Sequence, residues 1–156
     1  MGRGKQQVHR RSAKRMGSLN FSGLPDGALL LVDTAPIIYV LEAHPEFASR
    51  FQPVFAAHEA GRLRFALSTI TIAEVLTGPL KSGDEALAEK YLAILQSWQV
   101  VPLDEAVAAG AARLRASLGL KLADAVQAAS ALAINAAGLL THDRDFSRVH
   151  ALRIIS

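Results

Sequence analysis

The sequence predicts an α/β fold, a three-layer α/β/α sandwich in which helices cover both faces of a mostly parallel sheet. Short apolar runs without polar alternation are typical of strands buried on both faces of a parallel sheet. These runs alternate with longer segments whose apolar residues recur at helical spacing, which is the pattern of βαβ units. With 156 residues, of which 51% are hydrophobic, the chain can bury one substantial core. We therefore expect one folded domain.

The elements predicted in the first half of the chain follow a turn at residues 25–27. Residues 29–32 form a fully apolar run that predicts the first strand, and Asp33-Thr34 can cap a helix that continues to Leu41. Phenylalanines at helical spacing predict a second helix over residues 46–60. The next predicted elements are a strand at 64–67, a short helix at 71–76 and a helix at 84–95.

The second half of the chain continues the same alternation. Its predicted elements are a strand at 99–103, a helix at 104–118, a long helix at 122–136, a strand at 138–141 and an edge strand at 152–155. We expect the long helix to end at Ala137-Gly138, because glycine readily adopts the left-handed conformation that follows many helices. The predicted domain thus spans residues 28–156 and follows a disordered basic tail over residues 1–27.

Basic side chains are concentrated in the first 15 residues. The formal net charge is +3, but residues 1–15 hold six basic and no acidic residues, which leaves 11 basic and 14 acidic residues in the remainder. The overall charge therefore gives little support for nucleic-acid binding by the domain itself. Three interpretations of the tail stay open: a basic arm, an extension upstream of a start at Met16, and a sequence added for expression.

Composition excludes several classes of protein. The chain has no cysteine, so it has no disulfide framework, thiolate zinc site or cysteine nucleophile, and we expect a cytoplasmic protein. No apolar run reaches the roughly 18 residues of a membrane span, and the first 20 residues lack the apolar part of a secretory signal. Aromatic residues make up 6% of the chain, which predicts no platform for stacking single-stranded nucleic acid.

Asp33 and Asp143 each follow an apolar run that predicts a strand. Ligands of an open parallel sheet gather at the carboxyl ends of its strands, so both are candidate site residues. Asp33 is equally well explained as the N-cap of the next helix. Thr141 can orient a carboxylate through its hydroxyl group. We assign Asp145 a structural role, either paired with Arg144 or capping a short helix.

Glu74 and Asp124 lie on predicted helices. Glu74 is the one charged residue between Arg64 and Lys81, which weakens its interpretation as part of a solvated helix face; an unpaired buried carboxylate would be costly there. Asp124 stands in the first turn of the Ala-rich helix, where the helix dipole favours an acidic residue. Capping is therefore an alternative for Asp124, although the alanines that follow permit close packing of this helix start against the sheet.

Convergence of these four carboxylates would require a cation. Without one, carboxylates that share a site repel one another or take up protons. Mg²⁺ and Mn²⁺ prefer oxygen ligands and retain water for chemistry, so either ion would suit the site. The histidines beyond residue 20 are not at helical i, i+4 spacing, so no histidine metal site is predicted.

Four motifs occur in a fixed order along the chain: Leu-Val-Asp33-Thr34, Ile-Ala-Glu74-Val-Leu-Thr-Gly78, Leu-Ala-Asp124-Ala-Val-Gln-Ala-Ala and Leu-Leu-Thr141-His-Asp143-Arg-Asp-Phe146. With these motifs the chain resembles the PIN-domain nucleases, particularly the VapC-like toxins of prokaryotic toxin–antitoxin pairs. The resemblance covers approximately residues 29–155. Each motif is weak alone, but the ordered set is fairly specific.

The resemblance assigns roles to individual residues. It implies that the acidic metal-site residues are Asp33, Glu74, Asp124 and Asp143, with Thr34 and Thr141 at the accompanying hydroxyl positions. It also implies a five-stranded parallel sheet, Mg²⁺- or Mn²⁺-dependent cleavage of RNA, a homodimer, and inhibition by a small antitoxin that also binds DNA. The basic tail departs from the family pattern, since many such toxins begin almost directly at the first strand.

The resulting hypothesis is a metal-dependent ribonuclease. Asp33, Asp124 and Asp143 would bind one or two divalent ions, and Glu74 would be a further ligand or orient the attacking water. Nothing in the sequence indicates which RNA is cleaved. Two alternatives stay open. The first is a phosphatase or phosphotransfer domain with Asp33 as nucleophile, although this chain lacks the second acid two positions later that such hydrolases use. The second is a catalytically silent module that binds RNA or a partner.

Overall fold

The computed structural model describes residues 19–156, which form a sheet with the strand order β3-β2-β1-β4-β5. Its strands are β1 (Ala28–Val32), β2 (Leu63–Ser68), β3 (Gln99–Val101), β4 (Gly138–Leu140) and β5 (Ile154–Ile155). Every neighbouring pair of strands is parallel. The predicted five-stranded parallel sheet is therefore confirmed.

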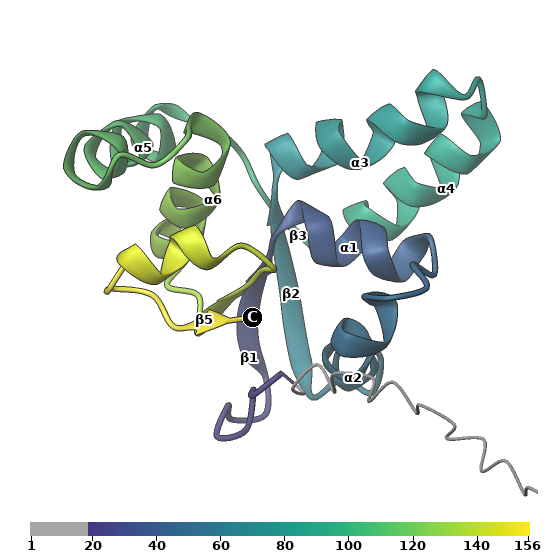
Figure 1. Cartoon of the computed structure of the whole chain (residues 1–156), viewed down its shortest axis with the longest axis horizontal. Helices are drawn as coiled ribbons and strands as arrows, with labels where there is room; N and C mark the ends of the chain where they lie inside the picture. Colours follow the sequence, from purple (N-terminus) through teal and green to yellow (C-terminus); the bar gives the residue numbers. More distant parts are fainter. Residues whose placement is uncertain (1–18) are drawn as a thin grey trace, which may run out of the picture.

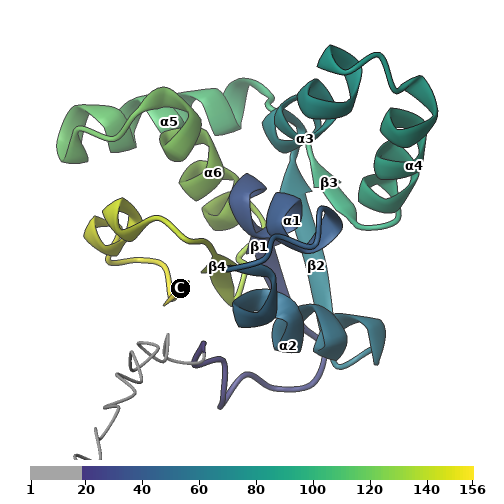
Figure 2. The ribbon, with the colours of Figure 1, turned by 45° about the vertical axis from the view of Figure 1, so that its right-hand side comes forward.

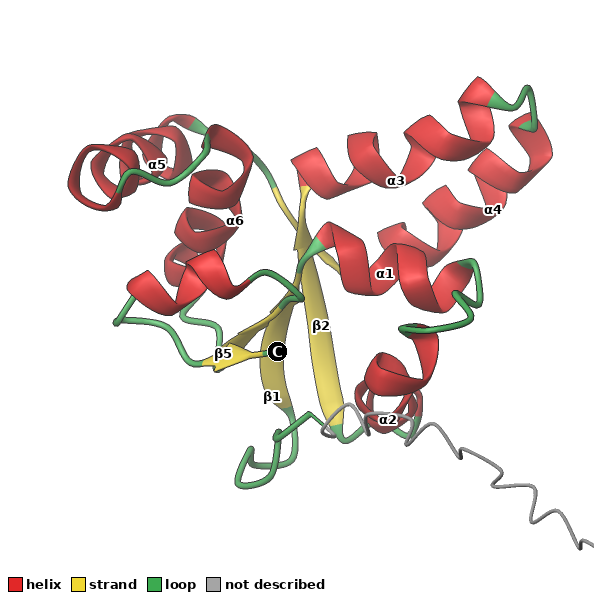
Figure 3. Cartoon of the chain, viewed as in Figure 1, coloured by secondary structure: helices red, strands yellow, loops and turns green. Residues whose placement is uncertain are grey.

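Helices cover both faces of this sheet, which confirms the predicted three-layer arrangement (Figure 1, Figure 3). The helices are α1 (Thr34–Leu41), α2 (Ala48–Glu59), α3 (Thr69–Lys81), α4 (Glu85–Gln96), α5 (Glu105–Leu118), α6 (Leu122–Ala133) and a 3₁₀ helix, η1 (Arg144–Arg148). In Figure 1, α1 to α4 lie to the right of the strands, and α5 and α6 lie to the left.

The residues of β1 divide between two hydrophobic cores. Leu30 and Val32 pack in the core that contains residues of α1 to α4, such as Ile37 and Phe51. Leu31 points to the opposite face and packs in the core formed with α5 and α6. Successive strand residues face opposite sides of a sheet, so a run that is apolar at every position is needed to fill both cores.

The strand order reverses between β1 and β4. From β1 the chain adds β2 and β3 on one side and then crosses to place β4 and β5 on the other side. Because an open parallel sheet binds ligands at the carboxyl ends of strands beside such a reversal, the residues that follow β1 and β4 occupy the favoured position. Helices α1 and α6 flank β1 in both views (Figure 1, Figure 2).

The last long helix ends earlier than predicted. Helix α6 stops at Ala133, and Asn135 adopts the left-handed conformation with φ of 49°. The prediction that Gly138 supplies this residue is wrong, because Gly138 begins β4. A Cβ atom at Gly138 would lie 3.1 Å from the carbonyl oxygen of Arg153 and 3.1 Å from Cδ1 of Ile155, so glycine is needed there for close strand packing.

Helix α3 is longer than the sequence predicts. The expected helix ended at residue 76, before Gly78 and Pro79, which both disfavour helix interiors. In the structure α3 continues to Lys81, and Pro79 is buried. Packing of this end against α4 outweighs the poor local propensity.

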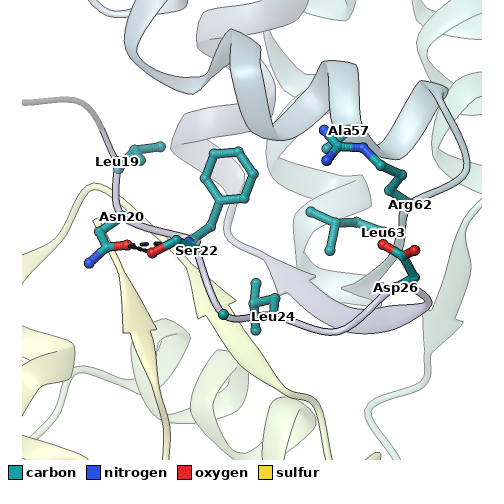
Figure 4. Close-up of a pocket in the computed structure, with 10 residues that line it drawn as sticks. Leu19, Asn20, Ser22, Leu24, Asp26, Ala57, Arg62 and Leu63 are labelled. Carbon is teal, nitrogen blue, oxygen red and sulfur yellow. Dashed lines mark hydrogen bonds between the residues drawn. The ribbon is translucent and has the colours of Figure 1, made fainter.

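The packed part of the chain begins before the predicted boundary at Ala28. Leu19 is buried, and Phe21 and Leu24 pack against the same core. Figure 4 shows this segment beside Arg62 and Leu63, where it borders a cavity of about 330 Å³ near the amino end of β2. Residues 1–18 of the predicted tail lie outside the described residues.

No helix within residues 19–156 combines the length and the apolar character needed to cross a membrane.

Candidate metal centre

Asp33 stands where β1 passes into α1, and its carboxylate has two tasks. It is the N-cap of α1, where Oδ1 accepts a hydrogen bond of 2.8 Å from the backbone N–H of Thr34. The same oxygen accepts a bond of 3.1 Å from Nε2 of Gln127, and Oδ2 accepts one of 2.8 Å from the hydroxyl of Thr141. The interpretation of Asp33 as an N-cap is therefore confirmed. The same side chain also lines a cavity, which is described below.

Thr141 connects the ends of β1 and β4. Its side chain is fully buried. Its hydroxyl donates to Asp33 and accepts a bond of 3.0 Å from the backbone N–H of Asp143. This one hydroxyl fixes the positions of two acidic residues relative to each other, which is the orienting role expected from the sequence.

Three carboxylates come together beside Asp33. Asp124, Asp143 and Asp145 each place an oxygen within 4.8 Å of the other two. Asp124 comes from the first turn of α6, while Asp143 caps η1 by accepting a bond of 2.8 Å from the backbone N–H of Asp145. Asp145 had been assigned a purely structural role, because sequence spacing does not reveal that the turn of η1 brings its side chain toward Asp124.

Glu74 lies on α3 and is exposed, so the cost of burying an unpaired carboxylate does not arise. It borders the same cavity as Asp33, Asp124 and Asp143. The hydroxyl of Thr34 donates to its Oε1 at 3.0 Å. Glu74 is outside the group of carboxylates that lie within 4.8 Å of one another in residues 19–156, and it approaches the cavity from the α3 side.

Gln127 was missed by the sequence analysis. It lies one helical turn after Asp124 on α6 and is 1% exposed. Its Nε2 donates to Asp33 and, at 2.8 Å, to the hydroxyl of Thr71, while its Oε1 accepts a bond of 2.8 Å from Ser68. The signal that could have revealed it is a single amide in an Ala-rich helix at i+3 from an acid, since such positions share a helix face.

The amide of Gln127 also sets the direction of a chain of hydrogen bonds to Glu74. Thr71 accepts from Gln127, so its own hydroxyl hydrogen is available for Thr34, whose Oγ1 lies 3.1 Å away. Thr34 in turn donates to Glu74, because a carboxylate only accepts. The side chains that border the cavity are thus held by a buried polar network.

The cavity has a volume of about 450 Å³. The residues that line it are Asp33, Thr34, Ala35, Ile38, Tyr39, Glu74, Ala123, Asp124, Gln127, His142 and Asp143. All four predicted acids and Thr34 are among them, whereas Thr141 lies beneath the surface. Acidic side chains border one part of this cavity, and the α1 residues Ala35, Ile38 and Tyr39 border another.

Burial and mutual repulsion favour the protonated form of two of these acids. Burial raises the pKa of Asp33, opposed by its bonds from Thr141 and Thr34, and the nearby charges of Glu74 and Asp143 raise it further. Burial also raises the pKa of Asp124, together with the charges of Asp143, Asp33 and Asp145. A cation among these oxygens would reverse both effects.

Two aromatic side chains that line the cavity, Tyr39 and His142, belong to a larger group of rings. We define the ring cluster as Tyr39, His44, Phe47, Phe51 and His142. The hydroxyl of Tyr39 lies 2.9 Å from Nδ1 of His142, and both side chains line the cavity. The low aromatic content predicts no platform for stacking single-stranded nucleic acid, and that stays a prediction; composition does not indicate where the fold places the rings.

The acidic residues fit a divalent cation. The group formed by Asp124, Asp143 and Asp145 offers oxygen ligands only, and Asp33 is joined to it through Thr141. Hard cations such as Mg²⁺ and Mn²⁺ prefer such ligands. Burial first, and nearby carboxylates in addition, raise the pKa values of Asp33 and Asp124, and a bound cation would favour the charged form of both acids.

Comparison with protein-family models matches residues 30–152 to the PIN domain. No match was found among the curated proteins. Solved structures with the same fold include a toxin–antitoxin complex from Klebsiella pneumoniae, which is 24% identical with a TM-score of 0.65. That alignment covers 81% of this chain and 96% of the other.

Two further structures show the same likeness. VapBC2 from Rickettsia felis, solved bound to a DNA fragment from its promoter, is 23% identical over 81% of this chain and 96% of the other, with a TM-score of 0.64. VapC20 from Mycobacterium tuberculosis, described as a sarcin-ricin loop cleaving toxin, is 15% identical over 81% of this chain and 99% of the other, with a TM-score of 0.66. At these identities the likeness establishes the fold.

Proposed function

The chain belongs to the PIN domain family, and from this premise we propose that it is a metal-dependent endoribonuclease that hydrolyses RNA phosphodiester bonds. The observation that carries the proposal is the meeting of Asp124, Asp143 and Asp145 beside Asp33 at the carboxyl ends of β1 and β4. Such a site suits a phosphodiester only with a cation present, because the carboxylates would otherwise repel its charge.

In this proposal four acidic residues would bind the cation, and a fifth, Glu74, would orient water or bind the cation as well. Asp124, Asp143 and Asp145 would hold Mg²⁺ or Mn²⁺, with Asp33 as a neighbouring ligand fixed by Thr141. When bound, the cation would lower the pKa of the attacking water and balance charge on the phosphate oxygens. Glu74, exposed at the cavity and held by Thr34, would orient that water or serve as a further ligand.

The biological role that we propose is that of a toxin in a toxin–antitoxin pair. Its support is the shared fold with structures of the toxin–antitoxin complex and the VapBC proteins described above. The proposed partners are RNA as substrate, a small cognate antitoxin and a second copy of the chain, in the cytoplasm. A short gene for a DNA-binding protein immediately upstream would support the antitoxin assignment.

The residue two positions after Asp33 disfavours the alternative of a phosphatase with an aspartate nucleophile. That residue is Ala35, whose side chain cannot act as the acid or base that would accompany the nucleophile. The hydrogen bonds that both carboxylate oxygens of Asp33 accept are compatible with a role as a metal ligand, because each oxygen can form more than one interaction.

A matched pair of substitutions tests the proposed function. Asp143 and Asp104 each cap a helix through Oδ1, with bonds of 2.8 and 2.9 Å to a backbone N–H. Asparagine can keep each cap while removing the charge. We expect Asp143→Asn to reduce cleavage of labelled single-stranded RNA by at least about a hundredfold, whereas Asp104→Asn should cleave at the parent rate.

The assay compares Mg²⁺, Mn²⁺ and EDTA with each protein purified in parallel. Cleavage by the parent chain should require the cation. Full activity of Asp143→Asn, or equal activity in EDTA, would show that contamination or another site is responsible and would overturn the proposal.

A further inference from the structure

The cavity that contains the acids also has an apolar and aromatic wall, formed by residues of α1 and by His142. Ala35, Ile38 and Tyr39 lie at i, i+3 and i+4 and therefore present one face of α1 to the cavity. His142 joins this wall from the residue that precedes Asp143. One cavity of about 450 Å³ thus combines carboxylates with apolar and aromatic side chains.

Tyr39 and His142 are held in place before any ligand arrives. Their rings meet edge to face with centroids 5.4 Å apart, and the Tyr39 hydroxyl bonds to Nδ1 of His142 at 2.9 Å. Phe47 and Phe51 support the histidine ring, with centroid distances of 4.6 and 5.9 Å. Both rings of the pair are partly exposed, so a ligand can reach them. Because the two side chains are already ordered, binding would cost little of their conformational entropy.

Two arginines adjoin these aromatic residues in the chain. Arg50 lies on α2 directly before Phe51, and Arg144 follows His142 by two residues. Nε of Arg50 is buried and has no hydrogen-bond partner in residues 19–156. Rings interleaved with arginines are the combination by which proteins bind unpaired nucleotides, since bases stack on rings and phosphates pair with cations.

We propose that Tyr39 and His142 form a subsite for the base of the nucleotide next to the scissile phosphate of single-stranded RNA. This inference rests on the proposed function, and it adds a position for the neighbouring base. A base has to be unstacked to reach the wall, so unpaired RNA should bind and duplex RNA should not. The acids handle the phosphate, and the wall holds the neighbouring base.

Binding measurements with bases present and absent test the subsite. The chain carrying Asp143→Asn, which is expected not to cleave, is titrated in Mg²⁺ with labelled oligoadenylate and with an abasic ribose-phosphate chain of equal length. The readout is the ratio of the two dissociation constants from fluorescence anisotropy. We expect oligoadenylate to bind more tightly, and His142→Asn in this background to reduce the ratio by about tenfold, the loss of one base–ring stack.

Two further variants separate the ring from other properties of His142. His142→Phe keeps the ring but loses the bond to Tyr39, and it should retain the ratio. His58 is the matched control, because it does not line the cavity that contains the acids. Its Nδ1 also forms a hydrogen bond, 3.0 Å from the Leu63 carbonyl oxygen, and its ring stacks on that of Phe65 with a centroid distance of 4.1 Å. His58→Asn should leave the ratio unchanged.

The outcomes distinguish this inference from the proposed function. A ratio that is unaffected by His142→Asn, or that falls equally with His58→Asn, would overturn the subsite even if the parent chain cleaves RNA. Tight binding of duplex RNA would overturn it as well. Absence of metal-dependent cleavage by the parent chain would instead overturn the proposed function. Melting temperatures identify any variant that fails to fold. If His142→Asn fails to fold, His142→Phe still tests whether an aromatic ring at this position maintains the ratio of dissociation constants.

Discussion

At the scale of single residues, Gln127 connects three polar side chains beneath the site. It is buried, and its amide donates to Asp33 and Thr71 while it accepts from Ser68. No other pairing of its oxygen and nitrogen satisfies these partners, because the carboxylate of Asp33 only accepts. The amide of Gln127 therefore orients Asp33, an acid of the proposed metal site, but is not itself a proposed metal ligand.

Substitution of Gln127 by leucine should destabilise the fold. The similar size of leucine leaves little cavity, but Ser68, Thr71 and Asp33 each lose a buried partner. We expect the free energy of unfolding to fall by about 1–3 kcal/mol, measured by urea denaturation in EDTA. The control is Gln52→Leu on the exposed face of α2, which should change stability by less than about 0.5 kcal/mol. Equal effects of the two substitutions would show that the network contributes nothing.

At the scale of elements, the approach of β4 to its neighbours depends on a residue without a side chain. Gly138 begins β4 beside Leu30 of β1, and Arg153 accepts a backbone bond of 2.9 Å from Leu139. A methyl group at Gly138 would meet the backbone of Arg153 at 3.1 Å. Backbone cannot move aside as a flexible side chain can, so β4 and the acids that follow it would shift.

Gly138→Ala and Gly110→Ala should therefore have opposite effects. The first crowds the centre of the sheet and should cost about 1–3 kcal/mol. The second adds a methyl group within α5 at 3.5 Å from Cβ of Ala129, an ordinary contact, and should gain up to about 1 kcal/mol from helix propensity. Thermal or urea unfolding measures both. A neutral Gly138→Ala would contradict the assigned role of close strand packing.

At the scale of the whole molecule, the proposed metal site joins parts of the fold that are distant in sequence. Asp33 follows β1, Asp124 lies in the first turn of α6, and Asp143 lies three residues after the end of β4. In the absence of a cation, burial and like charge raise the pKa of Asp33 and of Asp124 above the ordinary value of 3.8. Such groups bind protons more readily in the folded chain, so their contribution to stability decreases as pH rises from that value through the raised pKa.

Metal should consequently stabilise the protein more at high pH than at low pH, because the cation competes with protons for the same oxygens. We expect Mg²⁺ or Mn²⁺ to raise the melting temperature relative to EDTA at about pH 8, and to raise it much less at about pH 5, near the range where carboxyl groups titrate. Asp143→Asn should reduce the rise at the higher pH. An equal rise at both pH values, or in both proteins, would indicate nonspecific cation binding.

The layers of the molecule and the order of its elements were predictable from local patterns in the chain. Fully apolar runs such as Leu29 to Val32 fill cores on both sides of a sheet, and this requirement is readable because it acts on every residue of the strand. The placement of Asp33 and Asp143 at strand ends followed from the same alternation of strands and helices.

The polar and aromatic groups that share the cavity could not be predicted from local patterns, because they come from distant parts of the chain. Asp145 is near Asp124 because η1 turns back, Gln127 meets Asp33 because α6 packs beside β1, and His142 meets Tyr39 across a chain separation that leaves no local periodicity. Gly138 likewise belongs to strand packing and not to the helix end. Local patterns report which face a residue occupies, whereas contacts between distant segments depend on how the packed elements are oriented in space.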